Sequence, residues 1–173
     1  SLNIPYFSVQ NKIKGDKLNF DINSNAIGNI VKKLEFEGAI EAIGDQIFRI
    51  NIDTSDIIIY NRKWSISPGN QLTLYKNRLV PENLMLTQVE NNETIQIDSL
   101  GRKGLKLAAK NVSLDWLKEF VQIKNMEFQG RLNAVVEIED LFQATDFRAY
   151  AKVDSLKMND FYLGKLDTKI AFQ

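Results

Sequence analysis

The clearest pattern of hydrophobic and polar positions lies in residues 128–139. The even-numbered positions carry Phe, Gly, Leu, Ala, Val and Ile, and the odd-numbered positions carry Gln, Arg, Asn, Val, Glu and Glu. Because side chains on a strand alternate between its faces, this pattern predicts a long strand with one apolar face and one polar face, interrupted only by Val135. A helical period gives no continuous apolar stripe over the same residues.

Shorter alternating segments fill most of the rest of the chain. Their spacing of roughly ten residues is typical of an all-β protein, and we expect about eleven to fourteen strands. The polar clusters Asn23-Ser24-Asn25 and Thr54-Ser55-Asp56 resemble turns, so we expect a strand to end at each of them. The predicted fold is a long, mostly antiparallel sheet.

One segment has the pattern of a helix instead. Ser113 is a good N-cap residue, and Asp115 places an acid in the first turn. The apolar residues that follow have helical spacing, which predicts a short amphipathic helix of about two to three turns that caps the open apolar end of the sheet. The apolar residues of this predicted cap helix are Leu114, Trp116, Leu117, Phe120 and Val121.

A sheet with one apolar face must bury that face. A sandwich, a closed barrel and a curled trough all achieve this. Strands of about 13 residues exceed the usual five or six, and the predicted cap helix suits an open end, so the pattern favours a half-open groove. We expect residues 1–173 to form a single continuous groove segment that is a piece of a longer chain.

Composition excludes several classes of function. Lys plus Arg equals Asp plus Glu at 22 each, and this balance argues against a nucleic-acid partner. The chain has no His and no Cys, so it lacks the commonest general base, a Ser-His triad and thiolate chemistry. Glu137, Glu139 and Asp140 resemble a carboxylate cluster, but we expect them on a solvated face. We predict a non-enzymatic protein with no catalytic residue, cofactor or metal.

The order of these features resembles the TamB family, the AsmA-like inner-membrane subunits of the translocation and assembly module. The resemblance covers about Ile57 to Gln173, although residues 141–147 lack a proline that the family often has there. The segments that carry it are Trp64-Ser65-Ile66 before Pro68-Gly69-Asn70, then Leu79 to Leu84, Ile95 to Gly101, the Trp116-Leu117 segment, Phe128 to Leu132, and Phe161 to Leu166.

The resemblance implies a β-groove, or β-taco, with a hydrophobic interior. It also implies a protein of the periplasm of a diderm bacterium, anchored in the inner membrane by an N-terminal helix outside this chain. The implied partners are phospholipid or fatty acyl chains and an outer-membrane barrel of the Omp85 class. The implied functions are lipid transport between the two membranes and outer-membrane protein assembly.

If the groove holds lipid, we expect the apolar positions of the last three long strands to line it. The same pattern is also consistent with a closed core, and a β-sandwich adhesin or carbohydrate-binding domain is the alternative function. The predicted lining residues are Phe128, Leu132, Ala134, Val136, Ile138, Phe147, Ala149, Ala151, Val153, Leu166, Ile170 and Phe172.

Overall fold

A computed structural model describes residues 6–27, 31–76, 78–101, 103–115, 126–140 and 146–172. In these residues the chain forms thirteen strands and no α-helix, which confirms the all-β prediction and the expected number of strands. The strands are β1 (Tyr6–Lys14), β2 (Lys17–Ile27), β3 (Val31–Gly44), β4 (Ile47–Ile59), β5 (Arg62–Ile66), β6 (Gln71–Tyr75), β7 (Arg78–Glu82), β8 (Leu84–Gln88), β9 (Glu93–Leu100), β10 (Gly104–Ser113), β11 (Phe128–Ile138), β12 (Phe147–Met158) and β13 (Phe161–Phe172).

The chain divides into two compact units, Ser1–Asn91 and Asn92–Gln173. In the N-terminal unit, β1 to β5 are antiparallel neighbours in chain order, and β8 pairs with β5. The hairpin of β6 and β7 pairs with the first half of β4.

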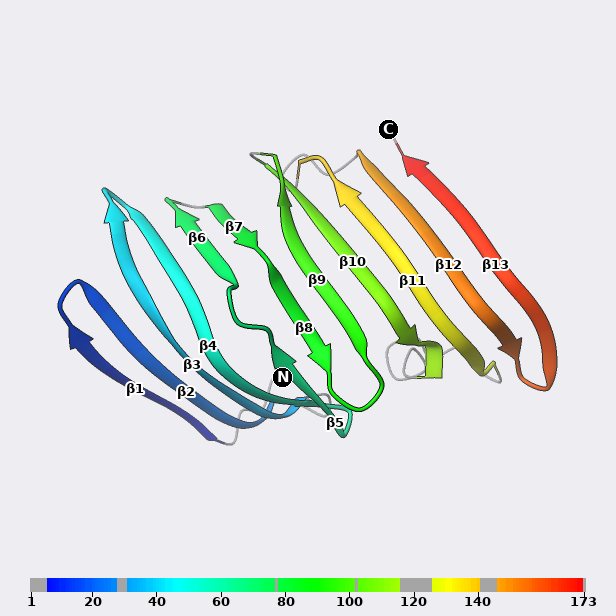
Figure 1. Cartoon of the computed structure of the whole chain (residues 1–173), viewed down its shortest axis with the longest axis horizontal. Helices are drawn as coiled ribbons and strands as arrows, with labels where there is room; N and C mark the ends of the chain where they lie inside the picture. The colour runs from blue at the N-terminus through cyan, green and yellow to red at the C-terminus, as the bar shows by residue number, and fades with distance from the viewer. Residues whose placement is uncertain are drawn as a thin grey trace. The chain divides into compact units, whose positions relative to one another are not determined.

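The C-terminal unit is a simple antiparallel meander. β9, β10, β11, β12 and β13 each pair with the next strand in the chain, and Figure 1 shows them side by side in that order. Consecutive antiparallel strands keep one face apolar wherever each strand alternates, so this unit can present a single continuous apolar face.

Two predicted turns are wrong, because strands run through them. β2 continues past Asn23 to Ile27, and Ser24 pairs with Leu34 of β3. β4 continues through residues 54–56 after a register shift that leaves Asp53 as an extra residue. The hydroxyl of Ser55 accepts a hydrogen bond of 2.6 Å from the backbone N–H of Ile66, so a residue with turn propensity is satisfied inside the sheet.

The predicted amphipathic helix is not seen among the residues that the structure describes. β10 extends through Ser113, which pairs with Arg131 of β11, and a short 3₁₀ turn follows at Leu114 and Asp115. Strand pairing therefore overrides the helical spacing at the start of the segment. The Ser113 hydroxyl does accept a hydrogen bond of 3.3 Å from the Asp115 backbone N–H, so the expected local capping contact is present. Trp116, Leu117, Phe120 and Val121 lie outside the described residues.

Few apolar side chains are fully buried. Trp64 is 1% exposed and lies between its cross-strand partners Ile57 and Gln88, in a packing role. The buried hydrophobic residues among those described are Ile57, Trp64 and Ile66 in the N-terminal unit and Val112, Leu114 and Val153 in the C-terminal unit. Most other large apolar side chains are half-buried or exposed, as expected for a sheet whose faces are not both covered.

Candidate functional site

The register of the C-terminal unit gathers the predicted lining residues on one face. Directly paired residues of antiparallel strands share a face, so each cross-strand row can be followed from β11 through β12 to β13. The rows are Ile138–Phe147–Phe172, Val136–Ala149–Ile170, Ala134–Ala151–Thr168, Leu132–Val153–Leu166 and Phe128–Met158–Phe161. We call this surface, with its continuation on β9 and β10, the apolar face.

Three register shifts keep the apolar face continuous where the simple alternation changes parity. One of them lies in β13, where Leu163 is an extra residue between Gly164 and Tyr162, and it brings Phe161 to the apolar face. β10 has one extra residue between Ala109 and Val112, and Asn111 there has a φ of 57°. β12 has one extra residue between Val153 and Leu156, and Ser155 there has a φ of 55°. Such bulges return later apolar side chains to the same face and bend the strand locally.

The sequence prediction missed part of the apolar face. Both β9 and β10 alternate, but only the register shows that their apolar positions continue the rows of β11. β12 and β13 contribute further residues beyond the bulge at Ser155. The missed residues are Ile95, Ile97, Leu105, Leu107, Ala109 and Val112, followed by Leu156, Met158 and Phe161.

The apolar face is not sealed by the described residues. Leu166, Ile170 and Phe172 are 44%, 53% and 56% exposed, whereas Val153 is 5% exposed. The other predicted lining residues are half-buried. In the described part of this unit, each strand makes its extensive contacts with the strands to which it is hydrogen-bonded. No second sheet of described residues packs across the apolar face. This arrangement disfavours a sandwich for the C-terminal unit.

Side-chain size varies across the apolar face in a regular way. Ala109, Ala134 and Ala151 are directly paired on three neighbouring strands, so a band of small side chains runs over β10, β11 and β12, with Ile95 of β9 and Thr168 of β13 at its two ends. At one end of the strands, the rings of Phe147 and Phe172 stack with centroids 6.0 Å apart. The face therefore has a low centre with bulkier side chains toward the strand ends.

The carboxylates of the polar face form surface ion pairs. Each lies close to a basic side chain of a neighbouring strand or turn, as expected for a solvated face. The pairs are Glu137 with Lys106 at 3.0 Å, Glu139 with Arg148 at 2.8 Å, and Asp140 with Lys103 at 3.1 Å. Among the described residues, no group of three or more acidic or other ligating side chains could hold a metal ion.

A further ion pair stabilises the bulge of β10. Glu93 has a fully buried side chain, and its Oε1 lies 3.0 Å from Nη1 of Arg131. The same Nη1 donates a hydrogen bond to the carbonyl oxygen of Asn111, and the Asn111 backbone N–H donates to Oδ1 of Asn133. These contacts satisfy both the carbonyl oxygen and the backbone N–H of Asn111, whose backbone is left-handed. The ion pair of Glu93 and Arg131 therefore has a structural role.

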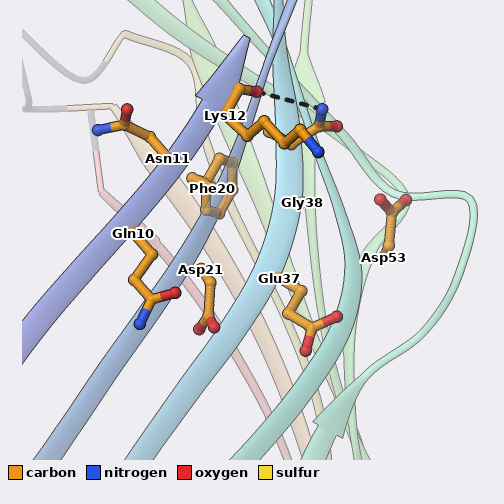
Figure 2. Close-up of a pocket in the computed structure, with 9 residues that line it drawn as sticks. Gln10, Asn11, Lys12, Phe20, Asp21, Glu37, Gly38 and Asp53 are labelled. Carbon is orange, nitrogen blue, oxygen red and sulfur yellow. Dashed lines mark hydrogen bonds between the residues drawn. The ribbon is translucent and has the colours of Figure 1, made fainter. Parts of the chain in front are cut away.

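The N-terminal unit contains a polar hollow of about 500 Å³ between β1, β2, β3 and β4. Figure 2 shows Gln10, Asp21 and Glu37 in one row across three neighbouring strands, as their pairing requires. The Asn19 amide donates a hydrogen bond to the carbonyl oxygen of Lys12. The lining is mainly amides and charged groups, so this hollow does not suit an apolar ligand.

A charged cluster lies on β3, β4 and β5 of the same unit. Lys33 Nζ is 2.8 Å from both Asp56 Oδ2 and Glu35 Oε2, and Lys63 is 3.3 Å from Asp56 Oδ1. The hydrogen bond from Lys33 lowers the pKa of the Asp56 carboxyl, and the same bond raises the pKa of Lys33. Both shifts favour the charged forms, so the cluster stabilises the sheet at neutral pH.

Comparison of the chain with protein-family models, with curated proteins and with solved structures finds no match. Among the described residues, no helix is long and apolar enough to cross a membrane. The apolar face is the surface of the described chain whose chemistry points most clearly to a ligand.

Proposed function

We propose that this chain is a non-enzymatic segment of a TamB-like envelope protein, and that its apolar face carries the acyl chains of phospholipids or fatty acids. The observation that supports the proposal best is the open apolar face, which continues over the five strands from β9 to β13. Large apolar surfaces that remain open to solvent are typical of ligand-binding grooves and of sites that contact proteins or membranes, and this supports the proposal.

Hydrophobic burial alone supplies the binding energy. Each methylene that leaves water contributes about 0.8 kcal/mol, so eight covered methylenes contribute roughly 6 kcal/mol before the cost of ordering the chain. Five strands spaced about 4.8 Å apart span roughly 20 Å, which is comparable with the length of an extended long-chain acyl group. No specific polar partner is needed for this step.

The band of small side chains gives the acyl chain a direction. Ala109, Ala134 and Ala151 form the lowest part of the apolar face, and this part runs across β10, β11 and β12. An acyl chain lying across the strands contacts these alanines and is flanked by larger residues such as Leu107 and Leu132. A sheet curled about this direction forms a half-open groove, and the bulges of β10 and β12 favour such bending.

The proposal extends to the cellular setting that the resemblance of residues 57–173 suggests. The segment belongs to an inner-membrane-anchored protein in the periplasm of a diderm bacterium. It works with an outer-membrane barrel of the Omp85 class in lipid transport, in assembly of outer-membrane proteins, or in both.

Native mass spectrometry tests the proposal directly. Protein purified without detergent or organic solvent is expected to carry phospholipid or fatty acid, released on collisional activation, and to take up a fluorescent fatty acid afterwards. Protein at the bare chain mass that takes up no fluorescent fatty acid contradicts the proposal.

A further inference from the structure

The band of small side chains has an aliphatic residue at one end and a hydroxyl at the other. Ile95 of β9 pairs with Ala109, and Thr168 of β13 pairs with Ala151, so both share the apolar face with the alanines. The placement of Thr168 follows from this pairing and does not depend on whether a further strand pairs with β13. The row that contains the band is therefore chemically different at its two ends.

The Thr168 hydroxyl is available to a ligand. Its side chain is half-buried, and among the described residues the hydroxyl has no hydrogen-bond partner. The rows on either side of the band pass through Val136 and Leu132, and on β10 to β13 they hold only apolar side chains. In this central part of the apolar face, Thr168 is thus the one side chain that can donate a hydrogen bond.

An acyl chain that lies in the band can take either of two orientations. Five strands span roughly 20 Å, so the head and the methyl end of a long acyl chain lie near opposite ends of the row. At Thr168, a carboxyl or ester oxygen of the head accepts a hydrogen bond from the hydroxyl. Against Ile95, the same oxygen would meet only aliphatic carbon and lose part of its hydration without a new partner. A hydrogen bond to a charged oxygen favours the first orientation roughly tenfold.

We propose that the apolar face binds acyl chains in one orientation, with the carboxyl or ester end at Thr168 and the methyl end at Ile95. This inference rests on the proposed function and adds a direction and a polar contact to it. The ligand is an acyl chain whose head carries a hydrogen-bond acceptor, a chemistry that fatty acids and phospholipids share.

Two diazirine fatty acids test the orientation, one with the diazirine close to the carboxyl group and one with it close to the terminal methyl. The first is expected to label β13 around Thr168 and the second β9 around Ile95, with the modified residues mapped by mass spectrometry. Reversed labels, or equal labelling of both strands by both probes, overturn the orientation but leave the lipid-binding proposal standing. If neither probe labels the apolar face, the proposed function fails and this inference fails with it.

A phosphatidylcholine whose tail carries either diazirine separates the two sources of the acyl chain. Labels at the same positions from both kinds of lipid show that an ester oxygen suffices for the contact. Labels from the fatty acids alone show that the contact needs a carboxylate. Both results keep the orientation, whereas reversed labels from the phospholipid overturn its extension to ester oxygens.

Substitutions of the hydroxyl test the contact itself. Thr168→Val keeps the shape of the side chain and is expected to weaken fatty-acid binding roughly tenfold and to remove the difference between the two probes. Thr168→Ser keeps the hydroxyl and is expected to retain both. Ser99→Ala is the control and is expected to change neither, because Ser99 lies on the same face outside the band, opposite Leu105. With folding confirmed by circular dichroism, unchanged affinity and unchanged labelling in Thr168→Val overturn the proposal.

Discussion

The substitution Val136→Glu separates an open apolar face from a sealed core. Val136 lies in the middle of β11, between Leu107 of β10 and Ala149 of β12, and it is half-buried. Val135 is its neighbour on the same strand, also half-buried, and it points to the polar face between Ala108 and Tyr150. Val135→Glu is therefore a matched control that introduces the same charge one residue away.

The expected cost in stability follows from the exposure of the two valines. Full burial of a valine side chain is worth about 1.5–3 kcal/mol, so losing a half-buried one costs about 1 kcal/mol. On an open face the new carboxylate reaches water, and both variants are expected to lose about 2–4 °C in melting temperature for a chain of this length. In a sealed core an unpaired charge costs several kcal/mol, and Val136→Glu alone would unfold the unit.

The expected effect on lipid binding is much larger for one variant than for the other. A carboxylate at position 136 removes contact with about three methylenes of an acyl chain, or about 2 kcal/mol, which weakens binding roughly thirtyfold. Val135→Glu leaves the apolar face intact and is expected to bind as the unmodified chain does. Fluorescent fatty-acid titration measures both affinities, and thermal unfolding followed by circular dichroism measures both stabilities.

Two results would refute this reasoning. If Val136→Glu unfolds the chain while Val135→Glu does not, the face is a sealed core. If both variants fold and bind lipid equally well, the acyl chains lie elsewhere.

Three further predictions concern the stability of the sheet. The hydrogen bond from Lys33 lowers the pKa of Asp56, so the ionised Asp56 stabilises the fold above about pH 4, and this stabilisation is lost as the pH falls through the lowered pKa. The urea concentration at the midpoint of unfolding should therefore fall with pH in that window, and Asp56→Asn is expected to make this dependence on pH weaker. Arg131→Ala removes the ion pair that Arg131 makes with the buried Glu93 and is expected to cost about 2 kcal/mol by urea unfolding; a loss below about 0.5 kcal/mol contradicts the assigned role. Gly38→Ala places a Cβ against a backbone carbonyl of β4 and is expected to lower stability by about 1–3 kcal/mol in the same assay, whereas an unchanged midpoint would show that β3 and β4 can move apart there.

The fold class could be predicted from the sequence because alternation is a local property of each strand. The alternating segment 128–139 forms β11 as expected, and its pairing with β12 has no register shift between Leu132 and Ile138. The predicted breaks at residues 23–25 and 54–56 failed for a physical reason. Pairing with a neighbouring strand supplies more hydrogen bonds than a local turn does, and turn propensity is a weaker term than such tertiary contacts.

The extent of the candidate site could be predicted only in part. The apolar-face residues of β11, β12 and β13 could be predicted because alternate positions of a strand share a face, and each of these strands alternates over most of its length. The contributions of β9 and β10 depend on register, which a single sequence does not determine. Neither β10 nor β12 carries a glycine or proline at its bulge, at Asn111 or Ser155, so the sequence of the bulged strand itself does not signal that Val112 and Met158 reach the apolar face; Gly130, with a φ of 144°, lies opposite Ser155 on the neighbouring strand, and only the pairing shows this.

Photo-cross-linking with a diazirine fatty acid shows where an acyl chain lies on the protein. The protein is labelled in the absence of detergent, digested, and the modified residues are mapped by mass spectrometry. We expect labels to concentrate on apolar-face residues of β9 to β13, including Ala134 and Val136, and the neighbouring polar-face residue Val135 to stay unlabelled. Absence of specific labelling, or labels spread equally over both faces of β11, would contradict the proposed function.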